Sequence, residues 1–177
     1  MRNYEYQIDE ITLQNKFNYK YLKDFVNAAN MPDMPLMLMS HAFPFPYTED
    51  DAVSFIEKNR ENGSEIFSVD FYIFYNKQFA GVIGISDIDY LNLRAHVGYW
   101  VSMEYWNHGI ATRSLKKIIQ FAGDELKLHS LYTATRTDNV RSAKVLLANH
   151  FSIYGVEPDS FNFNGKFYSS LLFSLLL

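Results

Sequence analysis

The amino-acid sequence predicts an α/β fold, of the α+β kind, in one domain spanning residues 1–177. The chain is 48% apolar, which is enough for one domain of this length with a substantial core. Hydrophobic periodicity predicts the element order β-α-α-β-β-β-α-β-α-β-β. The turn signals Asn76-Lys77 and Asn164-Gly165 each predict a hairpin, and hence antiparallel neighbours in the sheet.

The N-terminal third is predicted to hold a strand, a loop and two helices. Residues 4–13 alternate enough for an opening strand, and residues 18–30 repeat apolar side chains at helical spacing. Residues 31–47 contain four prolines, so we expect a loop with at most one helical turn. Thr48 is a suitable N-cap for a helix that runs to about residue 60, with Asp51 at its third position.

The rest of the chain is predicted to supply most of the sheet. Apolar runs bounded by turn residues predict strands at about 65–75, 78–88, 94–102, 129–136, 151–157 and 166–176. A helix is expected from residue 110 to about 126, and a second at 138–149. On the second helix, we expect Val140, Ala143, Leu146 and Leu147 to face the core. The leucine-rich C-terminus is expected to be a buried strand.

Charge and cysteine content exclude several kinds of function. A net charge of −4 disfavours nonspecific binding to nucleic acid. Without cysteine, the chain has no disulfide, no cysteine-based metal site and no covalent acyl-cysteine intermediate. The histidines also lack a metal-binding spacing, so we expect no metal. A secretory signal and a membrane-spanning stretch are absent, which favours a cytoplasmic protein without a membrane partner.

Residues 99–113 are the most informative part of the chain. An apolar strand leads through a short polar turn to Gly109, where an amphipathic helix begins. The first turn of a helix has N–H groups without intrahelical partners, and the helix dipole adds partial positive charge. Gly109 and the small Ala111 leave room for a phosphate to approach the main chain. The motifs of dinucleotide-binding folds and P-loops are absent, so another kind of phosphate site is indicated.

The hexapeptide Trp106-Asn107-His108-Gly109-Ile110-Ala111 resembles the pyrophosphate loop of the GNAT N-acetyltransferase superfamily, whose pattern is Arg/Gln-x-x-Gly-x-Gly/Ala. Trp106 replaces the first polar residue, as in the branch of ribosomal-protein N-terminal acetyltransferases. Residues 46–51, 81–84, 139–142 and 161–176 also match family patterns, so the resemblance covers nearly the whole chain. It implies a mixed, mostly antiparallel sheet with helices on both faces and a splayed strand pair that admits acyl-CoA.

The resemblance implies acetyl-CoA as the co-substrate. Its pantetheine arm is expected to pair with the backbone of Trp100, Val101 and Met103, and to bond Asn139. Its pyrophosphate is expected to lie against the main chain of Asn107, His108, Gly109, Ile110, Ala111 and Thr112.

Basic residues near the start of the helix after Gly109 are candidates for further phosphate contacts. Arg113 stands where the family commonly has glutamate, and this departure is expected to add a contact. Lys116 and Lys117 follow in the next turn, where a solvated basic helix face is an equal alternative.

Three residues are candidates for the transfer step itself. By resemblance, the Val101 N–H polarises the thioester carbonyl and Ser142 donates to the departing thiolate, since Leu146 stands where many members have a tyrosine acid. His96 replaces the branch's glutamate and is a candidate base, because histidine has a reference pKa of about 6.5. The alternatives are a structural His96, an amine that arrives already neutral, and Ser142 as a packing residue.

The acceptor is expected to be an amine-bearing peptide or small molecule. The aromatic, proline-rich loop that contains His41 and Tyr47 is expected to bind it, and Asp87 to attract its positive charge. Branch resemblance favours a protein N-terminal α-amine. A polyamine, amino sugar or antibiotic is the alternative, and a non-catalytic acyl-CoA-binding module is a third hypothesis. Both a monomer and a homodimer are compatible with the sequence.

Overall fold

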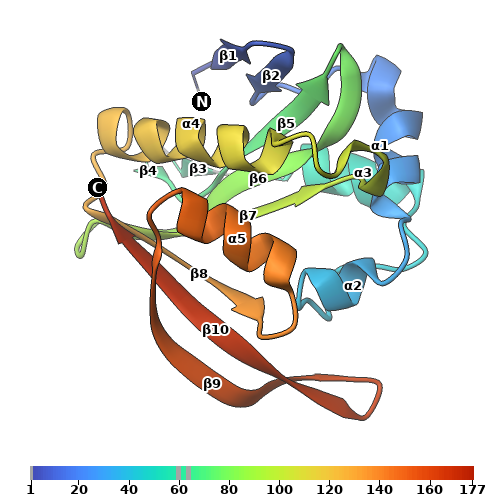
Figure 1. Cartoon of the computed structure of the whole chain (residues 1–177). Coiled ribbons are helices and arrows are strands. Elements are labelled where there is room, and N and C mark those ends of the chain that lie inside the picture. The colour runs from blue at the N-terminus through green and yellow to red at the C-terminus, as the bar shows by residue number, and fades with distance from the viewer. Residues whose placement is uncertain (1, 59–60, 63–64) are drawn as a thin grey trace.

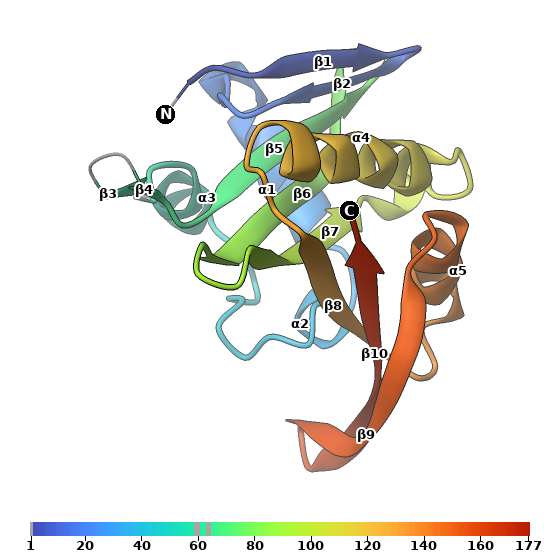
Figure 2. The same cartoon turned by 90° about the vertical axis from the view of Figure 1, so that its left-hand side faces the viewer.

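Eight strands form the central sheet of the computed structural model, which describes residues 2–58, 61–62 and 65–177. They are β1 Glu5–Ile8, β2 Ile11–Gln14, β5 Val69–Tyr75, β6 Gln78–Asp89, β7 Arg94–Val101, β8 Ser130–Arg136, β9 Ser152–Phe163 and β10 Lys166–Leu176. A separate hairpin pairs β3 Glu61–Asn62 with β4 Glu65–Ile66. The main sheet has the order β1-β2-β5-β6-β7-β8-β10-β9 (Figures 1 and 2). Only β7 and β8 run parallel, which confirms the predicted mixed, mostly antiparallel sheet.

Helices lie on both faces of the sheet, as predicted. Helices α1 Leu22–Ala29, α2 Met34–Met37 and α3 Glu49–Ile56 lie on one side, and α4 Ile110–Asp124 and α5 Val140–Ala148 lie on the other (Figure 2). Each side has its own apolar core, one around Phe25 and Phe79 and one around Phe71 and Phe121. No helix in the described ranges is long and apolar enough to cross a membrane.

Strand β7 contributes to both cores because successive side chains of a strand point to opposite faces. Val97 and Val101 are buried in the core beneath α4. Trp100 packs into the other core, with its ring centre 5.9 Å from that of Phe25. By the same alternation, His96 shares the face of Trp100 and Tyr99 shares the face of Val101.

Strands β7 and β8 separate along their length. They pair only through Arg94 with Ser130, Ala95 with Leu131, and His96 with Tyr132. Beyond these pairs, β8 continues its pairing with β10, while residues 97–101 of β7 pair only with β6. We call the divergence between residues 97–101 and 133–136 the fork (Figure 1). Its position confirms the predicted splayed strand pair.

Some element boundaries in the N-terminal half differ from those expected. The predicted strand at 4–13 is a hairpin of β1 and β2, because Asp9 adopts a left-handed φ of 50° and turns the chain. Thr48 and Asp51 form the predicted capping box of α3. This helix ends at Ile56 rather than near residue 60, and residues 59–60 lie outside the described ranges.

The C-terminal elements are less buried than their sequence pattern predicts. Leu146 of α5 is 1% exposed, but Val140 and Leu147 are 56% and 50% exposed, so their predicted inward positions are wrong. The reason is that this short helix packs on α4 along one side only. Strand β10 is also only partly covered, since Phe173 is fully buried while Leu176 is exposed.

Candidate active site

Residues 106–109 form a loop whose backbone leads into α4 without a side-chain cap. Asn107 and Gly109 have left-handed φ values of 66° and 69°. Among the described residues, no protein acceptor takes the N–H groups of residues 107–112, whereas Thr48 and Asn139 cap the starts of α3 and α5. We call residues 106–109 the α4 loop. Free N–H groups at the positive end of a helix dipole are an arrangement that attracts anions, so phosphate binding at this loop stays a prediction.

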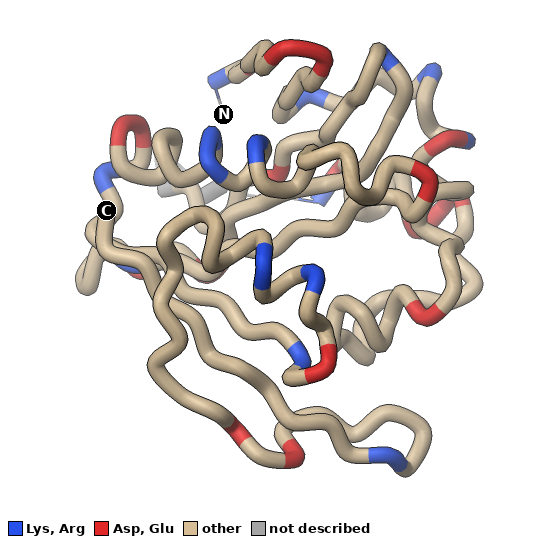
Figure 3. The backbone as a smooth tube through the Cα atoms, viewed as in Figure 1, with Lys and Arg blue, Asp and Glu red and all other residues tan. Residues whose placement is uncertain are grey.

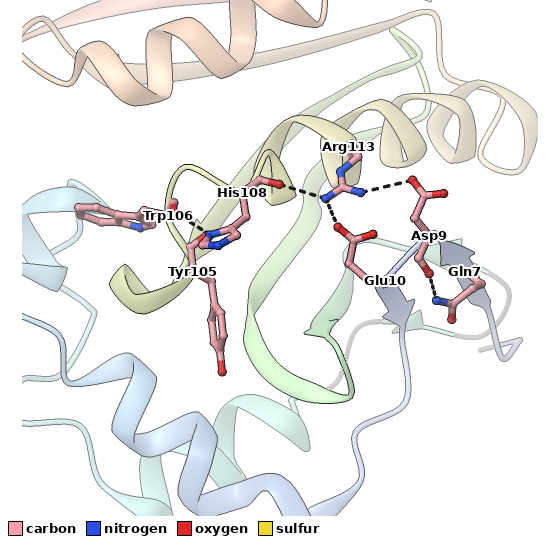
Figure 4. Close-up of polar contacts among 7 residues, drawn as sticks. All are labelled: Gln7, Asp9, Glu10, Tyr105, Trp106, His108 and Arg113. Carbon is pink, nitrogen blue, oxygen red and sulfur yellow. Dashed lines mark hydrogen bonds and ion pairs between the residues drawn. The ribbon is translucent and has the colours of Figure 1, made fainter.

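Two side chains within the α4 loop hold it in place. The indole Nε1 of Trp106 donates to the carbonyl oxygen of Val101 at 2.7 Å, which ties the loop to the end of β7. The Nδ1 of His108 lies 2.9 Å from the carbonyl oxygen of Trp106, a contact drawn in Figure 4. Because a carbonyl only accepts, Nδ1 carries the proton in this contact. The loop is therefore supported from within and by β7.

Arg113 is not the free cation that the sequence suggests. Its guanidinium lies 2.8 Å from a Glu10 carboxylate oxygen and 3.3 Å from one of Asp9, and it donates to the His108 carbonyl at 3.0 Å (Figure 4). The bond to Arg113 lowers the pKa of the Glu10 carboxyl. Lys117 is also engaged, with Nζ 4.3 Å from the centre of the Tyr6 ring. Arg113 therefore fixes the β1–β2 turn to the α4 loop, and we do not retain it as a phosphate contact.

The backbone edge of β7 at the fork ends at Val101. Ser102 N–H donates to the Ala80 carbonyl at 2.8 Å, so Ser102 and, by strand alternation, Trp100 direct their backbone groups to β6. The Val101 N–H consequently points into the fork, and its contact with the thioester carbonyl stays a prediction. Met103 does not extend this edge, because it begins the 3₁₀ turn Met103–Tyr105 and its carbonyl accepts from Trp106 N–H at 3.2 Å.

On the α5 side of the fork, two hydroxyl groups meet. The Asn139 side chain accepts from Ser142 N–H at 3.2 Å, so Asn139 is a helix cap, and no acceptor in the described part of the chain takes its amide nitrogen. The Tyr99 hydroxyl lies 3.1 Å from Ser142 Oγ and 3.3 Å from the Ser142 carbonyl oxygen. Burial raises the pKa of the Tyr99 hydroxyl to about 12, so it stays protonated near neutral pH. The sequence did not lead us to predict a role for Tyr99, although strand alternation places it on the face of β7 opposite His96.

On the opposite face, His96 lies at the last residue pair before the fork. Its Nδ1 is 3.3 Å from Ser86 Oγ, and the Ser86 hydroxyl donates to an Asp87 carboxylate oxygen at 3.4 Å. A β-bulge between Ser86 and Asp89 gives Asp87 its left-handed backbone. Burial lowers the pKa of His96 below its usual value, and the Asp87 charge partly offsets this. His96 is therefore neutral near pH 7.

A pocket of about 430 Å³ opens between the α2–α3 segment and the tip of the β9–β10 hairpin. Its lining residues are Asp33, Pro35, Ser40, His41, Phe43, Phe45, Phe163 and Asn164. His41 lines this pocket, and its role in acceptor binding stays a prediction. Phe45 in this lining is 53% exposed. Tyr47 is 5% exposed, with its ring 4.9 Å from that of Phe43 and its hydroxyl bonded to the Asp51 carbonyl, so we do not retain it as an acceptor contact.

Comparison with known families decides the relationship that the motifs suggest. A family model described as "Acetyltransferase (GNAT) domain" matches residues 18–152. The chain belongs to the GNAT acetyltransferase family. The matched region of this GNAT chain contains the fork, the α4 loop and α5.

Relatives of this GNAT chain are named for different substrates. Ribosomal-protein-serine acetyltransferase of Escherichia coli (strain K12) is 28% identical over 111 residues, covering 63% of this chain and 62% of that protein. Spermidine N(1)-acetyltransferase of the same strain is 26% identical over 92 residues, covering 52% and 50%. The chain therefore spans less than two thirds of the length of these curated relatives.

A solved structure supports the fold over nearly the whole chain. It is the microcin C7 self-immunity acetyltransferase MccE in complex with acetyl-CoA and AMP. The TM-score is 0.82 at 29% identity, and the match covers 96% of this chain and 94% of that chain. This likeness confirms the predicted GNAT fold.

Proposed function

We propose that this GNAT protein transfers the acetyl group of acetyl-CoA to a primary amine by direct attack in a ternary complex. The observation that carries the proposal is the placement of proton-handling groups on opposite faces of the sheet at the fork. Tyr99 and Ser142 lie on the α4–α5 side, and His96 lies on the α1–α3 side. An amine that approaches from one face, and a sulfur that leaves toward the other, would each meet a suitable group.

In the proposed reaction, each residue at the fork has one task. His96 accepts a proton from the amine as its nitrogen bonds to the thioester carbonyl carbon. The Val101 N–H stabilises the negative charge that develops on the carbonyl oxygen. When the carbon–sulfur bond breaks, the sulfur keeps the electron pair, and Ser142 donates a hydrogen bond to this thiolate. His96 then releases its proton to solvent.

The contacts of His96 favour the ring tautomer that this role needs. If the Ser86 hydroxyl donates to Asp87, Nδ1–H of His96 donates to Ser86 Oγ. Nε2 then has a free lone pair for the amine proton. The Asp87 charge, at the far end of the hydrogen-bonded series from His96 through Ser86, stabilises the imidazolium that forms. We accordingly assign Asp87 to the support of His96 rather than to direct binding of the acceptor.

We propose a protein N-terminal α-amine as the acceptor. The ribosomal-protein relative supports this choice, as does the reference pKa of an α-amine of about 7.7–8.0, which leaves a useful neutral fraction. A small amine carried on a planar group is a second candidate. The aromatic lining of the pocket at His41 favours it, and the similar MccE structure contains AMP.

A coenzyme-release assay over an acceptor panel tests both the activity and the acceptor. The panel contains short peptides with free N-termini, the same peptides with blocked N-termini, polyamines, aminoglycosides and an aminoacyl-adenosine analogue. Release that requires the free peptide N-terminus supports the first acceptor. Release with the adenosine analogue alone supports the second. If no amine raises coenzyme release above the rate without acceptor, the proposed activity is contradicted. The protein would then be a coenzyme-binding module.

Acetyl-CoA is expected to stabilise the wild-type protein, and Gly109→Val is expected to remove this effect. Ligand at about 100 times its dissociation constant adds about 2.7 kcal/mol to the free energy of unfolding. Valine is disfavoured at the left-handed φ of 69°, so the α4 loop must change conformation. A thermal-shift titration with acetyl-CoA measures both proteins.

Gly165→Val is the matched control for Gly109→Val. Gly165 also has a left-handed φ, of 82°, but lies in the open turn between β9 and β10. This variant is expected to lose stability without ligand and to keep the full acetyl-CoA shift. An undiminished shift in Gly109→Val would show that the loop conformation does not determine coenzyme binding.

A further inference from the structure

Arg141, in the first turn of α5, contacts the α4 loop. Its guanidinium carbon lies 4.4 Å from the centre of the Trp106 ring. Trp106 is itself fixed by its indole bond to the Val101 carbonyl. A cation over an aromatic face is attracted by the ring quadrupole and keeps the N–H groups at its edge free for an anion. This contact therefore holds a positive charge beside the loop whose N–H groups lack acceptors.

Two other arginines in this region are already paired with carboxylates. Arg113 pairs with Glu10 and Asp9, and Arg136 pairs with Asp138 at 2.7 Å. Over the described ranges, no carboxylate pairs with Arg141, whose side chain is exposed. Helix α5 itself contains no acidic residue and carries only basic charge in Figure 3. Arg141 is thus a cation available to an anion at the loop.

We propose that Arg141 binds the pyrophosphate of the coenzyme from α5, opposite the N–H groups of the α4 loop. This inference rests on the proposed use of acetyl-CoA. Trp106 occupies the position at which the family pattern has a polar Arg or Gln, and it has no charge to offer the phosphates. It instead acts as a platform for a guanidinium that comes from another helix. A planar guanidinium can bond two phosphate oxygens at once, which a lysine cannot do.

Calorimetric binding to the full chain tests this role with three probes: coenzyme A, dephospho-coenzyme A and pantetheine. A hydrogen bond to a charged group corresponds to a change in affinity of about 10- to 100-fold. We expect Arg141→Gln to weaken coenzyme A and dephospho-coenzyme A by the same factor, since both contain the pyrophosphate. Pantetheine has no phosphate. Its dissociation constant, measured by competition with a coenzyme A analogue, should be the same for the wild type and for Arg141→Gln.

Two further variants separate this role from a general effect of charge or folding. Lys144→Gln removes a positive charge from an exposed position one turn along α5 and should change each affinity less than about 2-fold, because exposed charges are screened. Arg141→Lys keeps the charge without the planar fork and should regain only part of the lost affinity.

The outcomes distinguish this inference from the proposed function. If the wild type does not bind coenzyme A, the proposed function itself is contradicted, and the role of Arg141 with it. If the wild type binds and Arg141→Gln binds equally well, Arg141 has no role in coenzyme binding. A loss confined to coenzyme A would place Arg141 at the 3′-phosphate, and a loss with pantetheine would indicate a distorted fork. Either result overturns the pyrophosphate assignment.

Discussion

His96→Gln is expected to lower kcat/KM about 100-fold or more, because general base catalysis usually contributes at least this factor. Glutamine keeps the size and polarity of the side chain but does not exchange a proton near neutral pH. The variant should still bind acetyl-CoA, since His96 lies on the face of the sheet opposite Ser142 and away from the α4 loop. Steady-state rates with the best acceptor, together with calorimetric coenzyme binding, measure both effects.

The pH dependence of the wild type follows from the burial of His96. Burial lowers its pKa below the reference value of about 6.5, so the base is neutral at pH 7 and becomes protonated only as the pH falls further. Protonation of the acceptor amine already lowers kcat/KM below about pH 8 in both proteins. We expect the wild type to show a second, more acidic inflection from His96, and this inflection to be absent in His96→Gln.

Protonation of His96 also affects folding in a predictable direction. Well above about pH 6.5, the histidine is neutral in both the folded and the unfolded chain and its titration makes no difference. Below this pH, the unfolded chain binds the proton more readily than the folded one, so the free energy of unfolding decreases. His96→Gln should therefore lose less stability than the wild type between neutral and acidic pH, as measured by urea unfolding.

His96→Glu and Asp87→Asn complete the test of the base. Glutamate restores the residue that is usual in the branch and should retain substantial activity. Asp87→Asn removes the charge that supports the imidazolium but leaves the imidazole, so its loss of rate should be smaller than that of His96→Gln. Near-normal turnover of His96→Gln with an unchanged pH profile would assign His96 a structural role and indicate an amine that arrives neutral.

The α4 loop could be predicted because its chemistry is local. A glycine at a helix start, preceded by a strand, is sufficient to indicate free N–H groups, and the structure has them. The role of Arg113 could not be predicted, because its partners lie on a β1–β2 turn that we expected to be part of one strand. His150, just after α5, adopts a left-handed φ of 65°, a conformation that favours glycine and that nothing in the local sequence pattern indicates.

The pairing of Tyr99 with Ser142 could not be predicted for a geometric reason. The two residues are 43 positions apart, and their contact depends on the separation of β7 from β8 and on the position of α5 beside the fork. Sequence periodicity places Tyr99 on the correct face of its strand but gives no distance between that strand and a helix. The family resemblance instead implies a tyrosine at position 146, where this chain has leucine.

Ser142→Ala is expected to lower kcat about 100-fold with little change in acetyl-CoA affinity, because removal of one donor to a developing negative charge typically has an effect of this size. The cap of α5 should survive, since Asn139 bonds the backbone N–H of residue 142 and not its side chain. Steady-state kinetics should show equal losses in kcat and kcat/KM, and calorimetry should show an unchanged dissociation constant for the coenzyme.

Tyr99→Phe tests whether the second hydroxyl acts through Ser142. With a pKa of about 12, Tyr99 keeps its proton. If Tyr99 donates this proton to Ser142 Oγ, the Ser142 hydroxyl is oriented with its own proton toward the sulfur. Loss of one neutral hydrogen bond should lower kcat by up to about 10-fold in the wild type. In a Ser142→Ala background, the same substitution should have little further effect, because the group it orients is absent. Independent, multiplicative losses would instead mean that Tyr99 contributes to the fork without Ser142, and that Ser142 is oriented by its own helix.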